Sequence, residues 1–418
     1  MITVKLRRPG ATTGQRAEDA LGIGAWCQGG REASMSNREL RKNARAGAGL
    51  IQRPKVGHSM WQVAMIVMVL ALPARGQDAA SQIRAEAERL HHSLRDKPIS
   101  YPDIPNASKM VGDGLQEVIQ GESAGRLYIS LEKLCQTTDF LHAVWAVADK
   151  AEAVKAGLPA YEAEWEKVSS SVTAIDRQAR EKDWNDSPMA VRALSETAQG
   201  MTMPLLEGAR GFAVSMQPKD GLFNLGQAQG QAEFVAFCST LHLPRKAAPY
   251  PLRSLMPEIE ILQEKANAAF QPPRSIDLHT LFMSLNSALK QARELDATKC
   301  YAGALYQYLY AVGFYGMLDA APPDSSQQSA LKSALATARQ KLDASPRDDS
   351  IPQLFLEKAE SQVAHADGSA PSADDWRIAK VVVDQVLPAY FALDKPLLAA
   401  QRAPGKTIDI TLVRWPYT

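Results

Sequence analysis

Cysteine is scarce in this chain, and the few that occur follow no recognisable pattern. The sequence holds Cys27, Cys135, Cys238 and Cys300, with no C-x-x-C spacing among them. This excludes a regular disulfide framework and a thiolate zinc knuckle. We expect the cysteines to be small buried hydrophobic residues; the alternative is one disulfide among Cys135, Cys238 and Cys300 in an oxidising compartment.

Long hydrophobic runs are also missing. The most apolar stretch, VAMIVMVLAL at 63–72, would rise about 15 Å as a helix, against a hydrocarbon core of about 30 Å. It has the length of a signal-peptide core, and Ala74 and Gly76 supply small side chains at the −3 and −1 positions. We therefore expect residues 60–76 to be a signal peptide and the mature protein to be exported, periplasmic or extracellular, with no transmembrane span left. The alternative is a buried core segment in a cytoplasmic protein.

Residues 1–59 show little sign of a folded unit, because they are rich in Arg, Gly and polar residues without sustained apolar periodicity. We interpret them as a disordered or untranslated basic extension. Translation then begins at Met1, Met35, Val56 or Met60. Met35 is favoured slightly over Met60, because it keeps basic residues ahead of the apolar core of the signal peptide.

The mature chain has no excess of positive charge. Residues 77–418 contain 35 Lys and Arg against 42 Asp and Glu, a net charge of −7. The basic residues are scattered among acidic ones, so phosphate backbones would be repelled. Nucleic acid is therefore not an expected partner.

Motifs for catalysis are absent as well. The sequence has no G-x-S-x-G, no H-E-x-x-H, no C-x-x-C-H and no glycine-rich phosphate loop after a strand. No cofactor is expected from it. An enzyme of unfamiliar type stays open as an alternative, since missing motifs do not exclude one.

What the sequence does contain is helical periodicity, and it predicts an all-α protein. Apolar residues follow one 4-3-4-3-4 spacing from Leu127 to Trp145 and again from Tyr161 to Ala179. The AGLP turn between them predicts an antiparallel hairpin within a four-helix bundle at 122–242. A third helix should be capped by one of the residues 185–187 and kink or break near 200–204. A fourth carries Gly226-x-x-x-Gly230, which indicates close approach of a neighbouring helix, or else a ligand against bare backbone.

Proline-rich segments divide the rest of the chain. A linker at 243–257 holds four prolines and marks the best domain boundary. We expect N-terminal helices and an extended segment at 77–121, and a helical array at 258–400, for which stacked solenoid-like hairpins are one form. Residues 401–418 are expected to form a short C-terminal strand and tail, because 407–413 alternate apolar and polar side chains; the segment 99–104 is the candidate partner of the strand.

Two carboxylate–imidazole pairs are candidate metal ligands. Glu88 with His91, and Asp139 with His142, each lie one helical turn apart, the spacing found in di-iron bundles. A complete site would need two further inward carboxylates, and Asp is shorter than the usual Glu. The simpler interpretation is solvated or structural side chains, so no metal is expected.

The uncharged stretch 300–318 is the best candidate for ligand binding. It contains five tyrosines and Phe314, arranged in two stripes around one helix. A helix that is apolar on more than one face is central to a helical array. The simpler interpretation is a core helix; the alternative is a groove lined by Tyr308, Tyr310 and Phe314 for an apolar or aromatic ligand.

These features together favour a binding or scaffolding role in the cell envelope or outside the cell, with an unknown protein or an apolar or aromatic ligand as partner. Helical arrays offer extended surfaces for such a role. The alternative is an enzyme without a recognisable motif, most specifically a metal-dependent helical bundle.

Overall fold

Helices make up nearly all of the described structure, so the all-α prediction is confirmed. The computed structural model describes residues 78–99, 104–215, 217–243, 248–271, 275–364 and 370–393, and in these residues no β-sheet forms. The first half contains α4 (Ala79–Asp96), α5 (Ala107–Ser123), α6 (Leu127–Lys150), η1 (Ala153–Ala156), α7 (Leu158–Glu181), α8 (Met189–Val214) and α9 (Pro218–Thr240). The second half contains α10 (Met256–Ala269), η2 (Ile276–Leu278), α11 (His279–Ala297), α12 (Tyr301–Asp319), α13 (Ser325–Asp343), α14 (Ser350–Val363), α15 (Ala373–Val381), η3 (Val382–Val386) and α16 (Leu387–Ala392).

Several helices begin where local sequence chemistry places them. Gly157 has a positive φ of 112° just before α7, and a proline occupies the first turns of α7 and α9. Asp324 and Ser372 form capping boxes at α13 and α15. These ends agree with the predicted helices.

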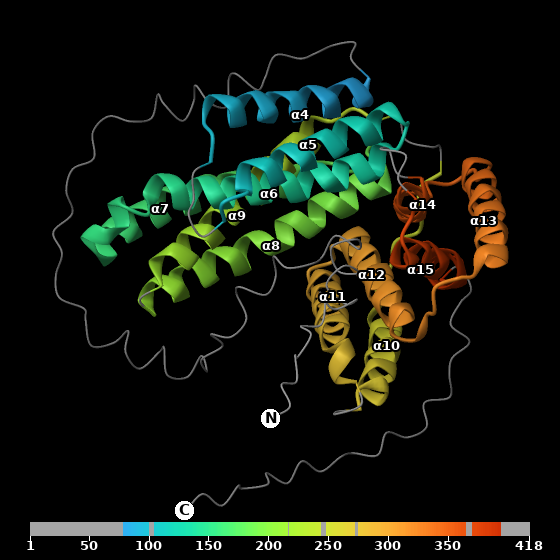
Figure 1. Ribbon diagram of the computed structural model, residues 1–418. Coiled ribbons are helices and arrows are strands. Elements are labelled where there is room, and N and C mark those ends of the chain that lie inside the picture. Colours follow the sequence, from blue (N-terminus) through green and yellow to red (C-terminus); the bar gives the residue numbers. More distant parts are fainter. Residues whose placement is uncertain are drawn as a thin grey trace, which may run out of the picture.

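The N-terminal bundle is built around α9, which contacts α6, α7 and α8 (Figure 1). The predicted hairpin of α6 and α7 is wrong in its packing: α7 turns back, but it lies chiefly against α9 and α8. The reason is two polar anchors, one from the buried Tyr161 and one from the half-buried Trp165. The Tyr161 hydroxyl donates to the Ala209 carbonyl at 2.7 Å, and Trp165 Nε1 donates to the Leu206 carbonyl at 3.0 Å.

Close contact of α6 and α9 explains the glycine pair. A Cβ at Gly226 would meet the His142 carbonyl and would lie 2.6 Å from Ala143 Cα, and one at Gly230 would lie 2.7 Å from Asp139 Cα. These are backbone atoms, which cannot move aside as a flexible side chain does. The predicted close approach of a neighbouring helix is thus confirmed.

α8 differs from its prediction at its start, where the N-cap residue is Pro188 rather than Asn185, Asp186 or Ser187. The helix continues through Pro204, so the predicted break is wrong, and the predicted kink there stays a prediction. Neighbours on two sides hold it: α9 packs along it in the bundle, and α12 crosses it from the second half. Packing over this length offsets the one hydrogen bond that Pro204 removes.

One hydrophobic core runs across both halves of the chain. It includes Leu131 and Leu194 of the bundle together with Leu305, Phe355 and Val386 of the second half. A smaller core of α6–α9 side chains fills the bundle around Tyr161. The domain boundary at 243–257 stays a prediction, because a core shared by the two halves does not show whether either half folds on its own.

Three predictions fall outside the described residues: the extension at 1–59, the signal peptide at 60–76 and the strand within 401–418. In the part of the chain that is described, no helix has both the length and the apolar character needed to span a membrane.

Candidate functional site

The four predicted metal ligands do not come together in one group. Glu88 is exposed on α4, and His91 is half-buried one turn later. On α6, Asp139 Oδ2 accepts a hydrogen bond from Gln227 Nε2 at 3.0 Å, and His142 Nε2 lies 3.0 Å from Glu233 Oε2. Among the described residues, no three His, Cys, Asp or Glu side chains are placed to share a metal ion.

Asp139 and His142 instead join α6 to α9. Asp139 is only 8% exposed, and burial raises the pKa of its carboxyl to about 7, against hydrogen bonds from Gln227 and Gln231 that lower it. Cys135 lies on the same face of α6, and Sγ is 3.6 Å from Gln231 Oε1. Cys135, Cys238 and Cys300 all have free thiols, so the disulfide considered as an alternative does not form among them in this structure.

The three predicted groove residues have different surroundings. Tyr310 and Phe314 are buried in the core, at 1% and 0% exposure. Tyr308 is half-buried on another face of α12, and its pKa is raised to about 12 by burial and by the charge of Glu258. Tyr308 is therefore the one groove candidate with an accessible ring.

A buried ionic cluster, missed by the sequence reasoning, lies where α12 and α14 meet α6. Lys358 Nζ of α14 donates to the Tyr310 hydroxyl at 2.6 Å and to Glu132 Oε1 of α6 at 3.2 Å. The Tyr310 hydroxyl itself donates to Glu132 Oε1. Lys358 and Glu132 are each 2% exposed, so the pair is shielded from water on all sides.

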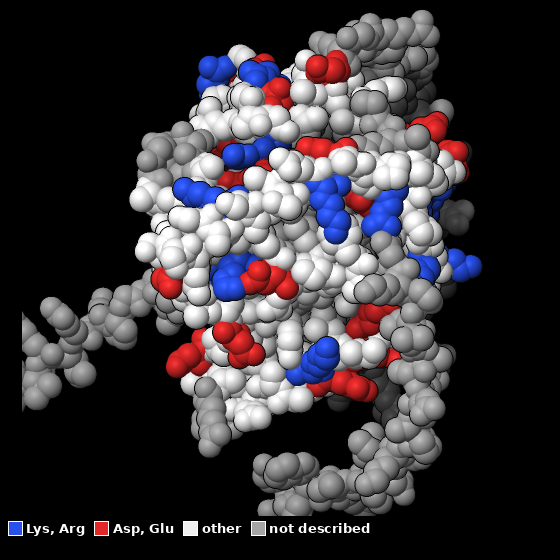
Figure 2. All heavy atoms as spheres, turned by 90° about the vertical axis from the view of Figure 1, so that its right-hand side faces the viewer, with Lys and Arg blue, Asp and Glu red and all other residues white. Residues whose placement is uncertain are grey.

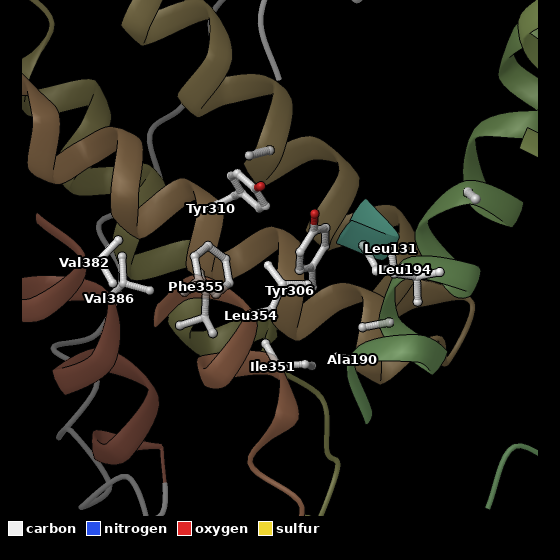
Figure 3. Packing of buried hydrophobic residues seen from close by; sticks show 14 of the residues in the cluster. Leu131, Ala190, Leu194, Tyr306, Tyr310, Ile351, Leu354, Phe355, Val382 and Val386 are labelled. Atoms are coloured by element: carbon white, nitrogen blue, oxygen red, sulfur yellow. The ribbon is translucent and has the colours of Figure 1, made fainter. Parts of the chain in front are cut away.

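Aromatic rings form the walls of this cluster. Tyr306 and Tyr310 pack edge to face at 4.9 Å, and Phe355 lies 5.0 Å from the Tyr310 ring. Figure 3 shows both phenolic oxygens turned away from Leu354 and Ile351. Burial lowers the pKa of Lys358 to about 8, although the neighbouring Glu132 charge raises it, and burial raises the pKa of both tyrosines well above the usual range.

Next to Lys358, Glu357 caps α6 from a distance of more than 200 residues in sequence. Its Oε2 accepts the backbone N–H groups of Tyr128 at 2.9 Å and Ile129 at 3.0 Å. The local N-cap residue of α6, Arg126, makes no side-chain cap bond. The carboxylate therefore satisfies two of the free N–H groups and meets the positive end of the helix dipole.

At three more helix N-termini, a side chain distant in sequence accepts hydrogen bonds from backbone N–H groups. Asp348 Oδ2 and Ser350 Oγ accept from the Met189 and Ala190 N–H groups of α8. Asp296 Oδ2 accepts from the Leu255 N–H ahead of α10, and Glu196 Oε2 accepts from the Gly303 N–H of α12. Each cap ties one helix end to another part of the chain.

The sequence does carry a signal for Lys358. In α14 the buried apolar residues Ile351 and Leu354 precede Lys358 at spacings of seven and four, so the lysine occupies a core position of the helix. A charge on the apolar stripe indicates a buried partner. The partner itself, Glu132, is 226 residues away, and no local pattern points to it.

The chemistry available to this cluster is that of a shielded amine beside a phenol and a carboxylate. A lysine with a pKa of about 8 is partly unprotonated near neutral pH and could act as a base or nucleophile. Its hydrogen bonds to Tyr310 and Glu132, however, lie within the interface of α6, α12 and α14. Joining helices is the role that the geometry supports best.

The outer surface shows mixed charge. On the face drawn in Figure 2, Lys and Arg lie among Asp and Glu and do not gather into a stripe of one sign. That face therefore offers no single-sign patch that would attract a phosphate backbone.

Comparison with the patterns of known protein families, with curated proteins and with solved structures finds no match to this chain.

Proposed function

We propose that the mature chain is an exported helical protein with a binding or scaffolding role in the cell envelope or outside the cell. The observation that carries this proposal is the use made of the buried polar groups. Glu132, Glu357 and Lys358 bond helices that are distant in sequence, as do Glu196, Asp296 and Asp348. Groups used in this way fix one shape and leave contact with a partner to the outer surface.

The candidate partner surface that we propose is provided by α10 and η2. Three large hydrophobic side chains are exposed there, Ile261 at 42%, Phe270 at 41% and Ile276 at 63%. We call these three residues the α10 edge. Tyr308 interacts electrostatically with Arg253 and Glu258, at the start of α10. An apolar or aromatic partner could contact the exposed Phe270 ring and the aliphatic side chains of Ile261 and Ile276.

Site-specific photocrosslinking in the native host tests this surface. A benzophenone amino acid at Ile276 should give one discrete crosslinked product. The same amino acid at Val214, which is 59% exposed at the far end of α8, should give none. No product at Ile276, or the same products at both positions, would contradict the assignment of the α10 edge.

Export is tested separately by N-terminal sequencing of the protein purified from its host. We expect the mature chain to begin near Gln77, because a signal peptidase cleaves after small residues such as Ala74 and Gly76. A purified protein that retains residues 63–72 would refute export. It would favour the alternative, in which this segment is a buried part of a cytoplasmic protein.

The alternative function, an enzyme, is favoured by one observation, the amine of Lys358 beside the Tyr310 hydroxyl. A substrate would reach this amine only after α14 separates from α6, because Lys358 is 2% exposed. The metal-dependent form of this alternative would need other residues than Glu88, His91, Asp139 and His142, which the structure does not gather. The binding role is therefore the better supported of the two.

A further inference from the structure

The N-terminal end of α4 lies at the edge of the bundle, where α4 packs on α5 and α6 (Figure 1). Ala79 and Ile83 are 3% and 0% exposed, so the first turns of the helix are held against the core. Asp78 is the N-cap residue, and its Oδ1 accepts the Ser81 N–H at 2.8 Å. Asp78 itself is exposed, so this end of the helix is open to solvent.

Signal-peptide cleavage would place the α-amino group of the mature chain next to this cap. A cut after Gly76 makes Gln77 the terminal residue, one position ahead of Asp78. This step rests on the proposed export, and Gln77 lies outside the described residues. The amide dipoles of a helix place about half a positive charge at its N-terminus, so a terminal ammonium group there is unfavourable. The first turn of α4 contains no acidic residue, which leaves the cap residue Asp78 to offset both positive charges.

A terminal glutamine can lose that ammonium charge by a reaction with its own side chain. The unprotonated α-nitrogen attacks the side-chain amide carbon Cδ and forms a new C–N bond. The bond from Cδ to the side-chain nitrogen breaks, and that nitrogen leaves as ammonia with a proton from the α-nitrogen. The product, pyroglutamate, is an uncharged lactam, so the terminal charge is removed as it is by N-terminal acetylation. The reaction consumes no oxidant, reductant or second substrate.

We infer that Gln77 is a modification site, converted to pyroglutamate in the mature protein after signal-peptide cleavage. The ring leaves the N-terminus of α4 without a neighbouring ammonium group, which stabilises the first turn. It also closes the chain to aminopeptidases, because these enzymes need a free α-amine. Exposed chain ends are preferred sites of proteolysis, so this protection serves a protein that works outside the cytoplasm. The modification goes beyond the proposed binding role.

Mass spectrometry of the protein purified from its native host tests the modification. The free amines of the intact protein are dimethylated first, so that a free Gln77 amine is labelled and can no longer form the ring during handling. Trypsin, which then cleaves only after arginine, releases the N-terminal peptide QDAASQIR at 77–84. We expect this peptide to be unlabelled and lighter by one ammonia molecule than its unmodified sequence.

The internal control is the peptide QKLDASPR at 340–347, whose glutamine becomes terminal only during digestion. Its ring-containing fraction measures cyclisation caused by handling, and an equal fraction in both peptides would overturn the inference. A dimethylated peptide 77–84 would also overturn it, while still supporting export. A peptide that begins at Gly76 or earlier would contradict both export and the modification, because cleavage after Gly76 would not have taken place.

A second measurement tests the charge argument. Gln77→Ala, exported from the same host, keeps the length of the mature chain but leaves a free ammonium group, which is charged at about pH 6. We expect amide hydrogen exchange at Ser81, whose N–H is bonded to Asp78, to be about twofold to fivefold slower in the native protein than in this variant. The α11 amides at 285–289 should exchange equally in both proteins. Equal rates at Ser81 would contradict the stabilising role of the ring.

Discussion

Replacing Lys358 by methionine should destabilise the protein by about 3–5 kcal/mol, measured by urea unfolding at neutral pH. Methionine fills a similar volume, but it leaves the Glu132 carboxylate buried at 2% exposure without the ammonium group. Removing one partner of a buried ion pair strands an uncompensated charge, which costs about this much. The Tyr310 hydroxyl remains a donor to Glu132 but brings no positive charge.

The matched control is Lys290→Met on the surface of α11. Lys290 is also paired with a glutamate, Glu294, at 3.6 Å, but its side chain is 72% exposed. Exposed pairs contribute at most about 1 kcal/mol, so the control should unfold close to the wild type. An equal loss of unfolding free energy in the two variants would show that burial of the Lys358–Glu132 pair does not determine its contribution to stability.

Replacing Gly226 by alanine should cost about 3 kcal/mol or more in the same assay, although alanine is the better helix former. The added methyl group would meet the His142 carbonyl and would lie 2.6 Å from Ala143 Cα, so α6 and α9 would have to separate. Overpacking a tight contact costs about 1–3 kcal/mol and sometimes more, and here the obstacle is backbone.

Gly211→Ala provides the opposite case within the same bundle. Gly211 is an exposed residue of α8, and a Cβ there would meet nothing within 4 Å. Alanine should therefore stabilise the protein by up to about 1 kcal/mol through helix propensity alone. A loss at Gly211, or a gain at Gly226, would contradict the packing of α6 on α9.

The helices themselves could be predicted because their signals are local. The 4-3-4-3-4 spacing in α6 and α7 places apolar residues on one face, and short proline- or glycine-containing segments end most helices. The glycine pair of α9 likewise indicated a close helix neighbour. Which neighbour each helix has was less visible, since α7 has an apolar stripe that fits α8 and α9 as well as α6.

The remote caps could not be predicted, because both partners are ordinary until they meet. Pro188 at the start of α8 has no capping side chain, and its sequence neighbours Asn185, Asp186 and Ser187 are better candidates by composition. The actual acceptors, Asp348 and Ser350, lie about 160 residues later. Helix patterns carry no information on such pairings.

In the candidate site, too, local features could be predicted and long-range contacts could not. Tyr310 was singled out correctly as part of a central helix, because an uncharged aromatic stretch is a local feature. Its hydroxyl partners were not foreseen, because no local pattern links Lys358 to Glu132, which lies 226 residues away in the sequence. Buried ionic contacts between distant helices are the part of this fold that only the three-dimensional arrangement provides.

A double-mutant cycle between Glu132 and Lys358 tests most directly the claim that buried charges join the two halves of the chain. Urea unfolding of Glu132→Gln, Lys358→Met and the double variant gives the coupling energy of the pair. We predict about 2–3 kcal/mol, with the double variant more stable than Lys358→Met alone, because the stranded charge is gone. A coupling below about 0.5 kcal/mol would mean that the two side chains do not interact, and it would contradict the account.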